Sequence, residues 1–142
     1  MTMAELRPFH VAVLVDDLAA AREFYGGLLG CREGRNADSW VDFDLFGHQL
    51  VCHLHSAAAG AGASSPVDAH DVPVPHCGVV LDMDDWRQLA GRLTESGQEF
   101  VVEPYIRFRG QAGEQGTLFI RDPAGNALEF KGFRNLEQLF AR

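Results

Sequence analysis

Two segments of the chain follow the same plan, and this internal repeat limits what the chain can fold into. The segment "FHVAVLVDDLAAAREFYGGLLG" starts at Phe9, and "PHCGVVLDMDDWRQLAGRL" starts at Pro75. In each segment a histidine opens a short apolar strand, an aspartate follows six positions later, and a helical pattern comes next. Each segment is therefore expected to begin its own module, with a strand followed by a helix.

Capping residues and apolar spacing mark the two expected helices. Either Asp16 or Asp17 can cap the first helix, and either Asp82 or Asp84 the second, by accepting hydrogen bonds from first-turn N–H groups. Apolar residues then recur three or four positions apart in both segments. We expect the first helix to end at about 27–30 and the second at about residue 96, where glycines follow.

Three strand-like runs follow each helix. They lie near 31–35, 40–45 and 49–55 in the first half, and near 99–102, 117–121 and 126–133 in the second. The turns "FGHQ" and "DPAGN", with Gly47 and Gly125, separate the last two strands of each half. The predicted fold is therefore α+β, with two βαβββ modules.

The segments between and after the modules differ in composition. We place module one at 6–56, a linker at 57–74, module two at 75–133 and a helical tail at 134–142. The linker is rich in Ala, Gly, Ser and Pro, and its flexible part is expected to end near Pro66. The stretch "EPYIRFRGQAGEQG" is longer than a minimal turn, so we expect a loop over a pocket there.

Composition excludes several classes of partner. A net charge of −8 with scattered Lys and Arg argues against nucleic acid as a partner. No apolar run approaches the roughly 18 to 20 residues that a membrane span needs, and the first residues lack a signal-peptide core, so we expect a cytoplasmic protein. The three cysteines have no paired spacing and are expected to be free thiols.

Strand alternation gathers three polar side chains on one kind of surface. Bulky apolar residues of the opening strands should face the helices, which leaves His10 and His76 on the opposite faces. In the last strand Leu128 and Phe130 take the helix side, which leaves Glu129 opposite. A buried carboxylate is costly without a partner, and a divalent cation that also binds two imidazoles removes that cost. Pairing of Glu129 with a nearby Lys or Arg is the simpler alternative.

The chain resembles the vicinal oxygen chelate superfamily, which includes glyoxalase I, extradiol dioxygenases, fosfomycin-resistance enzymes and bleomycin-binding proteins. The resemblance rests on "FHVAVLVDDLAAAREFYGGLLG", "PHCGVVL" and "FIRDPAGNALEF", and covers about residues 6–133. It implies that the mixed sheets of the two modules curl into a cup with a metal at its floor. Mapped onto this sequence, the metal ligands are His10, His76 and Glu129.

The sequence departs from the glyoxalase I pattern at a fourth position. Those relatives carry a further carboxylate on the last strand of the first module, where this chain reads "HQLVCHLH". Counting from the turns, Gly125 plus four gives Glu129, whereas Gly47 plus four gives Val51. His53 shares a strand face with Val51, so it is a candidate acid or base, since histidine is the side chain suited to proton transfer near neutral pH. A surface or structural role for His53 is the alternative.

The resemblance therefore implies a metal-dependent enzyme, most like an extradiol-type Fe(II) dioxygenase acting on a small aromatic or vicinal-oxygen substrate. One alternative is an isomerase, lyase or thiol transferase with Mn, Ni, Zn or Mg. Another is a metal-free protein that binds a drug in the bleomycin-resistance manner. Tyr105, Arg107 and Arg121 are candidate substrate contacts, because guanidinium groups bind carboxylates in bidentate fashion. A homodimer is expected, with the site within one chain or shared between two.

Overall fold

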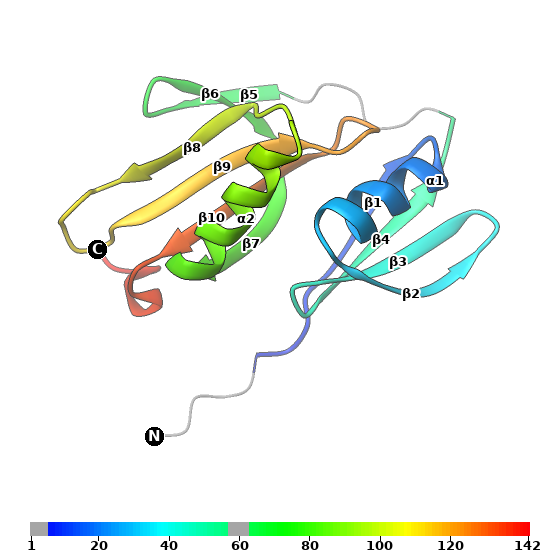
Figure 1. Cartoon of the computed structure of the whole chain (residues 1–142), viewed down its shortest axis with the longest axis horizontal. Coiled ribbons are helices and arrows are strands. Elements are labelled where there is room, and N and C mark those ends of the chain that lie inside the picture. The colour runs from blue at the N-terminus through cyan, green and yellow to red at the C-terminus, as the bar shows by residue number, and fades with distance from the viewer. Residues whose placement is uncertain (1–5, 57–62) are drawn as a thin grey trace. The chain divides into compact units, whose positions relative to one another are not determined.

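A computed structural model of the chain describes residues 6–56 and 63–142. The chain divides into two compact units, residues 1–58 and 59–142. Each unit contains one four-stranded mixed sheet and one principal helical segment (Figure 1).

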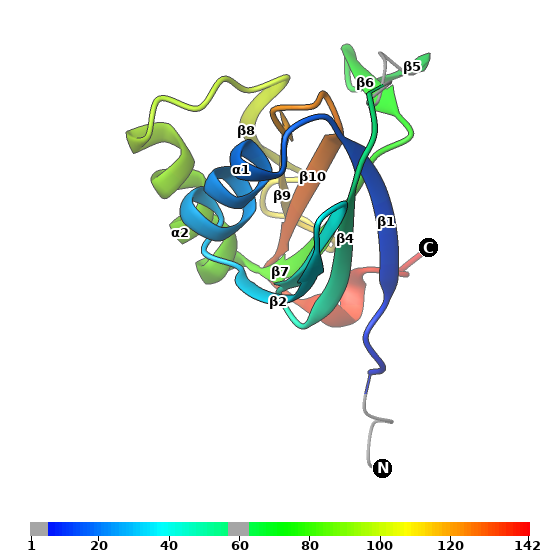
Figure 2. The ribbon, with the colours of Figure 1, turned by 90° about the vertical axis from the view of Figure 1, so that its right-hand side faces the viewer.

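Unit 1 is a βαβββ module with strand order β1-β4-β3-β2. Its elements are β1 (His10–Val15), α1 (Leu18–Ala21), the π-helix η1 (Arg22–Leu28) that continues α1, β2 (Arg32–Ala37), β3 (Trp40–Leu45) and β4 (His48–Leu54). Strands β1 and β4 are parallel, and the other neighbours are antiparallel. Figure 2 shows α1 and its continuation on one side of this sheet.

Unit 2 repeats the module with strand order β7-β10-β9-β8. Its elements are β5 (Ala63–Val67), β6 (His70–Val74), β7 (Cys77–Asp82), α2 (Met83–Glu95), β8 (Val102–Arg107), β9 (Gln115–Arg121), β10 (Ala127–Phe133) and the 3-10 helix η2 (Leu136–Gln138). Strands β7 and β10 are parallel, as β1 and β4 are in unit 1. The shared topology confirms the predicted α+β fold of two βαβββ modules.

Aspartate caps begin both helical segments, as the sequence predicts. Asp17 Oδ1 accepts a hydrogen bond from the Ala20 N–H at 3.1 Å, and Asp82 Oδ1 accepts one from the Asp85 N–H at 2.8 Å. These bonds satisfy first-turn donors that have no partner within the helix. They select Asp17 over Asp16 and Asp82 over Asp84 as the capping residues.

Each sheet buries one face under its own helix. In unit 1, Tyr25 of η1 is fully buried, and its ring lies 5.4 Å from that of Phe43 on β3. In unit 2, Trp86 of α2 donates from Nε1 to the Phe130 carbonyl oxygen at 2.9 Å. A Cβ added to Gly132 on β10 would lie 2.4 Å from the Trp86 Cβ, so this glycine allows the close approach of helix and strand.

The segment expected to be a linker contains a hairpin in its second half. Strands β5 and β6 pair antiparallel, and Asp68 and Ala69 between them have φ values of 48° and 64°. A two-residue turn with both φ values positive is usually marked by Asn-Gly or Asp-Gly. The Asp-Ala sequence lacks that glycine, which is why the hairpin was not predicted. The earlier part of the predicted linker, 57–62, lies outside the described residues.

Two further elements differ from the sequence analysis. A strand was predicted at 99–102 and a loop after it. The observed strand, β8, instead covers Val102–Arg107, so it starts at the end of the predicted strand and occupies the start of the predicted loop. Pro104 is compatible with β8 since β8 is an edge strand, where a missing N–H is tolerated. The C-terminal segment forms only the three-residue η2, and Phe140 is 89% exposed rather than docked. No helix in the described ranges is long and apolar enough to cross a membrane.

Candidate metal and substrate site

His76 and Glu129 lie side by side on the face of the second sheet that is opposite to α2. Glu129 lies between Leu128 and Phe130, which are both fully buried, and its register partners are Gly78 on β7 and Phe119 on β9. His76 immediately precedes β7, and its Nε2 lies 3.3 Å from Glu129 Oε2. The side chains are 28% and 12% exposed, so the pair is largely shielded from water. This confirms the strand faces that the alternation predicts for the second module.

The His76 ring is held in one orientation. Its Nδ1 lies 2.6 Å from the Pro73 carbonyl oxygen, which can only accept a hydrogen bond. The neutral ring therefore carries its hydrogen on Nδ1 and keeps a lone pair on Nε2, the atom that faces Glu129. The edge-to-face contact with Phe119, at 5.0 Å between ring centroids, also fixes the ring.

The two carboxylate oxygens of Glu129 have different neighbours. Oε1 accepts a hydrogen bond from Thr117 Oγ1 at 3.0 Å and lies 3.8 Å from Lys131 Nζ. Oε2 faces His76. The simpler alternative, in which Glu129 pairs with a lysine, thus holds for one oxygen, and the other oxygen lies against the imidazole.

The spacing of these donor atoms suits a shared metal ion. Two ligand atoms bound at right angles, each about 2.1 Å from an ion, are about 3.0 Å apart. The 3.3 Å between His76 Nε2 and Glu129 Oε2 is close to that separation. The donor set of one neutral imidazole and one carboxylate suits Zn, Mn, Ni or Fe(II). The same contact is an ion pair when His76 is protonated.

His10 belongs to unit 1, where it lies on the exposed face of β1. Its Nδ1 is 2.8 Å from Gln49 Oε1 on the neighbouring strand β4. Gln49 Nε2 in turn donates to Asp42 Oδ2 on β3 at 2.8 Å. His10 was predicted from the sequence, whereas Gln49 and Asp42 were not. The register of β1 and β4, which places His10 opposite Gln49, is the signal that would have found Gln49.

The predicted ligands are therefore divided between the units, with one histidine in unit 1 and the histidine and glutamate pair in unit 2. Across residues 6–56 and 63–142, no group of three or more His, Cys, Asp or Glu side chains is gathered closely enough to hold an ion. Whether His10 joins the pair stays a prediction.

Comparison with known proteins identifies the family. A sequence model of the Glyoxalase/Bleomycin resistance protein/Dioxygenase superfamily matches residues 7–130 of the chain. The chain belongs to this superfamily. No curated protein matches its sequence significantly.

Solved structures of the superfamily share the fold. A glyoxalase/bleomycin resistance protein/dioxygenase from Alicyclobacillus acidocaldarius is 30% identical, with a TM-score of 0.77 over 94% of this chain and 96% of that one. A lactoylglutathione lyase from Agrobacterium tumefaciens is 20% identical, with a TM-score of 0.63 over 94% and 96%. The fosfomycin resistance protein FosX from Listeria monocytogenes is 14% identical, with a TM-score of 0.65 over 96% and 98%. The last two identities are low enough to show the fold alone.

His53, the predicted acid or base, lies on the same face of the first sheet as His10. It lies on β4 opposite Leu14 of β1 and Trp40 of β3, and it is exposed. It lies four positions beyond Gln49, which is about 13 Å along a strand. His53 is thus remote from the Gln49 contact that holds His10, and its catalytic role stays a prediction.

Tyr105 and Arg107, predicted to contact substrate from a loop, lie on strand β8 instead. The Tyr105 hydroxyl donates to Asp68 Oδ2 at 3.0 Å. Arg107 forms an ion pair with Asp68 through Nε, but this contact does not have the geometry of a hydrogen bond. The Nη2 of Arg107 donates to Asp68 Oδ1 at 3.5 Å. Burial, and then the hydrogen bond to Asp68, raises the pKa of the Tyr105 phenol. Both side chains are therefore held by the β5–β6 turn.

An apolar cluster packs the β5–β6 hairpin onto the same face of the sheet as Glu129. Val72 of β6 is buried with Val102 of β8 and Phe119 of β9, and Val67 and Tyr105 pack around them. Phe119 is also the ring that lies against His76. The β5–β6 hairpin thus packs against the ring that contacts His76, and Figure 1 shows the hairpin beside β8.

The remaining predicted contact, Arg121, has a partner within unit 2. Arg121 lies opposite Ala127 on the Glu129 face and donates from Nη1 to the Gly125 carbonyl oxygen at 2.9 Å.

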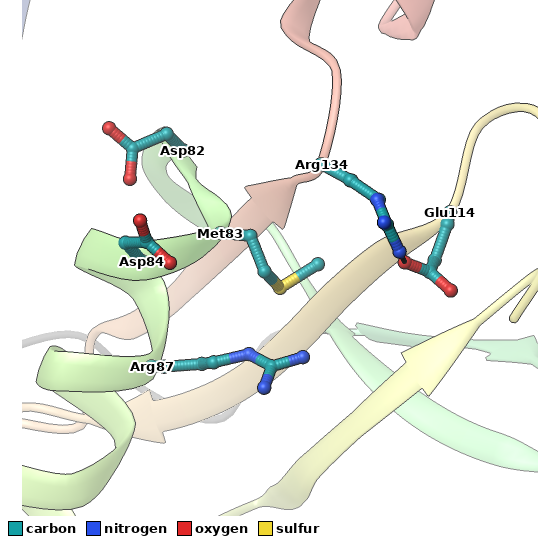
Figure 3. A pocket seen from close by; sticks show the side chains of 6 residues that line it. All are labelled: Asp82, Met83, Asp84, Arg87, Glu114 and Arg134. Atoms are coloured by element: carbon teal, nitrogen blue, oxygen red, sulfur yellow. Dashed lines mark hydrogen bonds and ion pairs between the residues drawn. The ribbon is translucent and has the colours of Figure 1, made fainter. Parts of the chain in front are cut away.

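Glu114 accepts from the Gly110 N–H at 2.8 Å, and this bond lowers its pKa. Glu114 therefore stabilises a turn, and it also pairs with Arg134 at 3.5 Å beside the start of α2 (Figure 3). The pocket shown in Figure 3, of about 390 Å³, is lined by Met83 and five charged residues and does not include the predicted ligands.

Proposed function

We propose that this chain is a metal-dependent enzyme of the vicinal oxygen chelate type, with His10, His76 and Glu129 as the metal ligands. The observation that supports the proposal is the His76–Glu129 pair, with donor atoms 3.3 Å apart on the face opposite the helix. The Pro73 carbonyl and Phe119 orient the imidazole, which is typical of metal ligands held by an outer shell. His10 supplies the third ligand, from the same chain or from a second copy.

The reaction we favour is that of an extradiol-like dioxygenase acting on a small aromatic or vicinal-oxygen substrate. Two imidazoles and one carboxylate form the facial arrangement that non-haem Fe(II) oxygenases use. The apolar Val51 supports this choice, because it stands where glyoxalase I-like relatives carry a further carboxylate. A bound Fe(II) would polarise adjacent substrate oxygens and lower their pKa values.

Residues of the chain itself position the site and the substrate. Thr117 and Lys131 hold one oxygen of Glu129, so its other oxygen is directed to the ligand position. Arg121 and Arg107 supply cationic groups for an anionic or phenolic substrate, although Arg107 must share its charge with Asp68. His53 is the candidate proton carrier. A homodimer in the cytoplasm stays the prediction for assembly and location.

A second candidate is an isomerase, lyase or thiol transferase with a redox-inert metal. It is compatible with the superfamily match, because the superfamily is named for glyoxalases as well as dioxygenases. The third candidate is a metal-free protein that binds a small drug. In such a protein His76 and Glu129 would form an ion pair with each other instead of binding a metal.

Metal analysis of protein purified under nitrogen tests these candidates. The proposal predicts one iron per site, together with oxygen uptake when catechols are added to the iron-loaded protein. A redox-inert metal without oxygen uptake would favour the second candidate. Protein that retains no metal and takes up none from Fe(II), Mn(II), Ni(II) or Zn(II) would overturn the metal-dependent function.

A further inference from the structure

We infer that Asp42 and Gln49 are positioning residues that hold the neutral His10 ring with its hydrogen on Nδ1 and its lone pair on Nε2. This inference rests on the proposed function, in which Nε2 of His10 binds the metal. It assigns roles to two side chains that the sequence analysis did not single out.

The direction of the hydrogen bonds follows from the chemistry of the carboxylate. Asp42 offers only acceptor oxygens, so the group that faces it at 2.8 Å is the NH2 group of Gln49. The amide oxygen of Gln49 then faces His10 Nδ1, also at 2.8 Å. An amide oxygen can only accept, so Nδ1 carries the hydrogen. The lone pair of the neutral ring is left on Nε2.

Asp42 is buried in a way that packing alone does not explain. It is 7% exposed, although its neighbours Val41 and Phe43 take the helix side of the same strand. Its Oδ1 is buried and has no hydrogen-bond partner among the residues that the structure describes. A Cβ added to Gly34 would lie 2.5 Å from this oxygen, so the glycine leaves room for the carboxylate. Burying a carboxylate is unfavourable, which indicates that Asp42 has a role other than packing.

His76 reaches the same tautomer by a different contact. Its Nδ1 lies 2.6 Å from the Pro73 carbonyl oxygen, and this oxygen also can only accept. In unit 2 the main chain fixes the ring, whereas in unit 1 a side-chain relay fixes it. Both histidines thus present Nε2 as the electron-pair donor, the form that a metal ligand requires.

Loss of Asp42 removes the group that orients the Gln49 amide. The amide can then rotate and present its NH2 group to His10, which makes Nδ1 the acceptor. The hydrogen of the neutral ring moves to Nε2, and a metal can bind this atom only when the hydrogen is lost. Asp42 therefore acts on the metal ligand through Gln49, without touching it.

The test is nitrogen-15 NMR of the histidine rings in metal-free protein, at a pH where His10 is neutral. Two-bond proton–nitrogen correlations report which ring nitrogen carries the hydrogen, and a His10→Gln variant identifies the His10 signals. We expect wild-type His10 to carry it on Nδ1. In Asp42→Ala and Gln49→Ala, the Nε2–H form should appear. Gln49 is exposed, so Gln49→Ala is expected to fold even if Asp42→Ala does not.

Asp44→Asn is the matched control. Asp44 lies on the same strand face as Asp42, but its carboxylate accepts from the Gly47 N–H, which an asparagine oxygen can also do. This variant should leave the His10 tautomer unchanged. A wild-type ring with its hydrogen on Nε2, or an unchanged tautomer in both Asp42→Ala and Gln49→Ala, would overturn the inference.

A titration of the same proteins with Mn(II) alone separates this inference from the proposed function. We expect Asp42→Ala to weaken Mn(II) binding roughly 10-fold to 100-fold, the range usual for outer-shell residues. If wild-type protein binds no metal while the tautomer still changes in the variants, the proposed function fails and the relay stands. If wild-type binds Mn(II) through His10 and neither variant changes affinity or tautomer, the relay fails and the proposed function stands.

Discussion

Val51 occupies the register position in the first sheet that Glu129 occupies in the second. Val51 pairs with Ala12, two residues after His10, and Glu129 pairs with Gly78, two residues after His76. The two modules therefore match residue by residue at the strand pair that carries the candidate ligands. The second module offers an imidazole and a carboxylate there, whereas the first offers an imidazole only.

This match predicts the effect of Val51→Glu. Val51 is 7% exposed and lies opposite Asp42, so a carboxylate there should destabilise the metal-free protein by about 1–3 kcal/mol. Zn(II) should recover more stability in Val51→Glu than in wild type, because the new carboxylate adds a ligand. Denaturant unfolding with and without Zn(II) measures both effects. Val51→Gln is the uncharged control, and an equal response to Zn(II) in the two variants would contradict the prediction.

The Asp68 contact predicts a change in the titration of Tyr105. Burial raises the pKa of the phenol, and the hydrogen bond to Asp68 adds to this. Asp68→Asn should therefore lower the pKa of Tyr105 toward its ordinary value of about 10. Tyrosinate absorbance measures the change, and Tyr105→Phe separates its signal from that of Tyr25. An unchanged titration in Asp68→Asn would show that Asp68 does not hold the phenol in solution.

The buried thiol of Cys31 predicts a loss of stability at alkaline pH. Burial, with a smaller effect from Asp44, raises its pKa from 9.0 to about 11. A group whose pKa is raised by folding contributes stability that is present below its unfolded pKa and is lost as pH rises to the folded value. The contribution of Cys31 to the free energy of unfolding should therefore fall between pH 9 and about 11. Urea unfolding across this range measures the loss, which Cys31→Ala should reduce.

Two glycines of unit 2 predict opposite responses to alanine. In Gly132→Ala the new methyl group meets Trp86, so we expect a destabilisation of about 1–3 kcal/mol. Gly91 lies within α2, and an added Cβ there has no neighbour within 4 Å among the described residues. Gly91→Ala should therefore stabilise by up to about 1 kcal/mol through helix propensity. Denaturant midpoints measure both, and equal stability of the two variants would contradict the packing described for Trp86.

The sequence predicts the local features of the fold because each rests on neighbouring residues. Aspartates before an amphipathic run narrowed each cap to two candidates, of which the structure selects Asp17 and Asp82. Alternation alone placed His76 and Glu129 on one face, since a strand turns successive side chains to opposite sides. Other features depend on partners far along the chain and were missed. Strand β8 contains Pro104, and only its edge position makes that residue acceptable.

The relay of Asp42, Gln49 and His10 shows the same limit at the candidate site. These residues come from three strands, and only the register brings Gln49 opposite His10. A single sequence does not reveal that register directly. Alternation places Asp42 on the open face of its strand, and the sequence pattern gives no sign that this face is buried at that position.

The central claim, that His10, His76 and Glu129 bind one metal ion, is tested most directly by titrating metal-free protein with Co(II) under nitrogen. The cobalt absorption bands report both stoichiometry and coordination. We predict one ion per site in wild type, and at least a 10-fold loss of affinity in each of His10→Ala, His76→Ala and Glu129→Gln. No loss is expected in the control His55→Ala, which changes an exposed histidine directly after β4. Affinity in all three variants equal to that of wild type, or wild-type protein that binds no cobalt, would contradict the account.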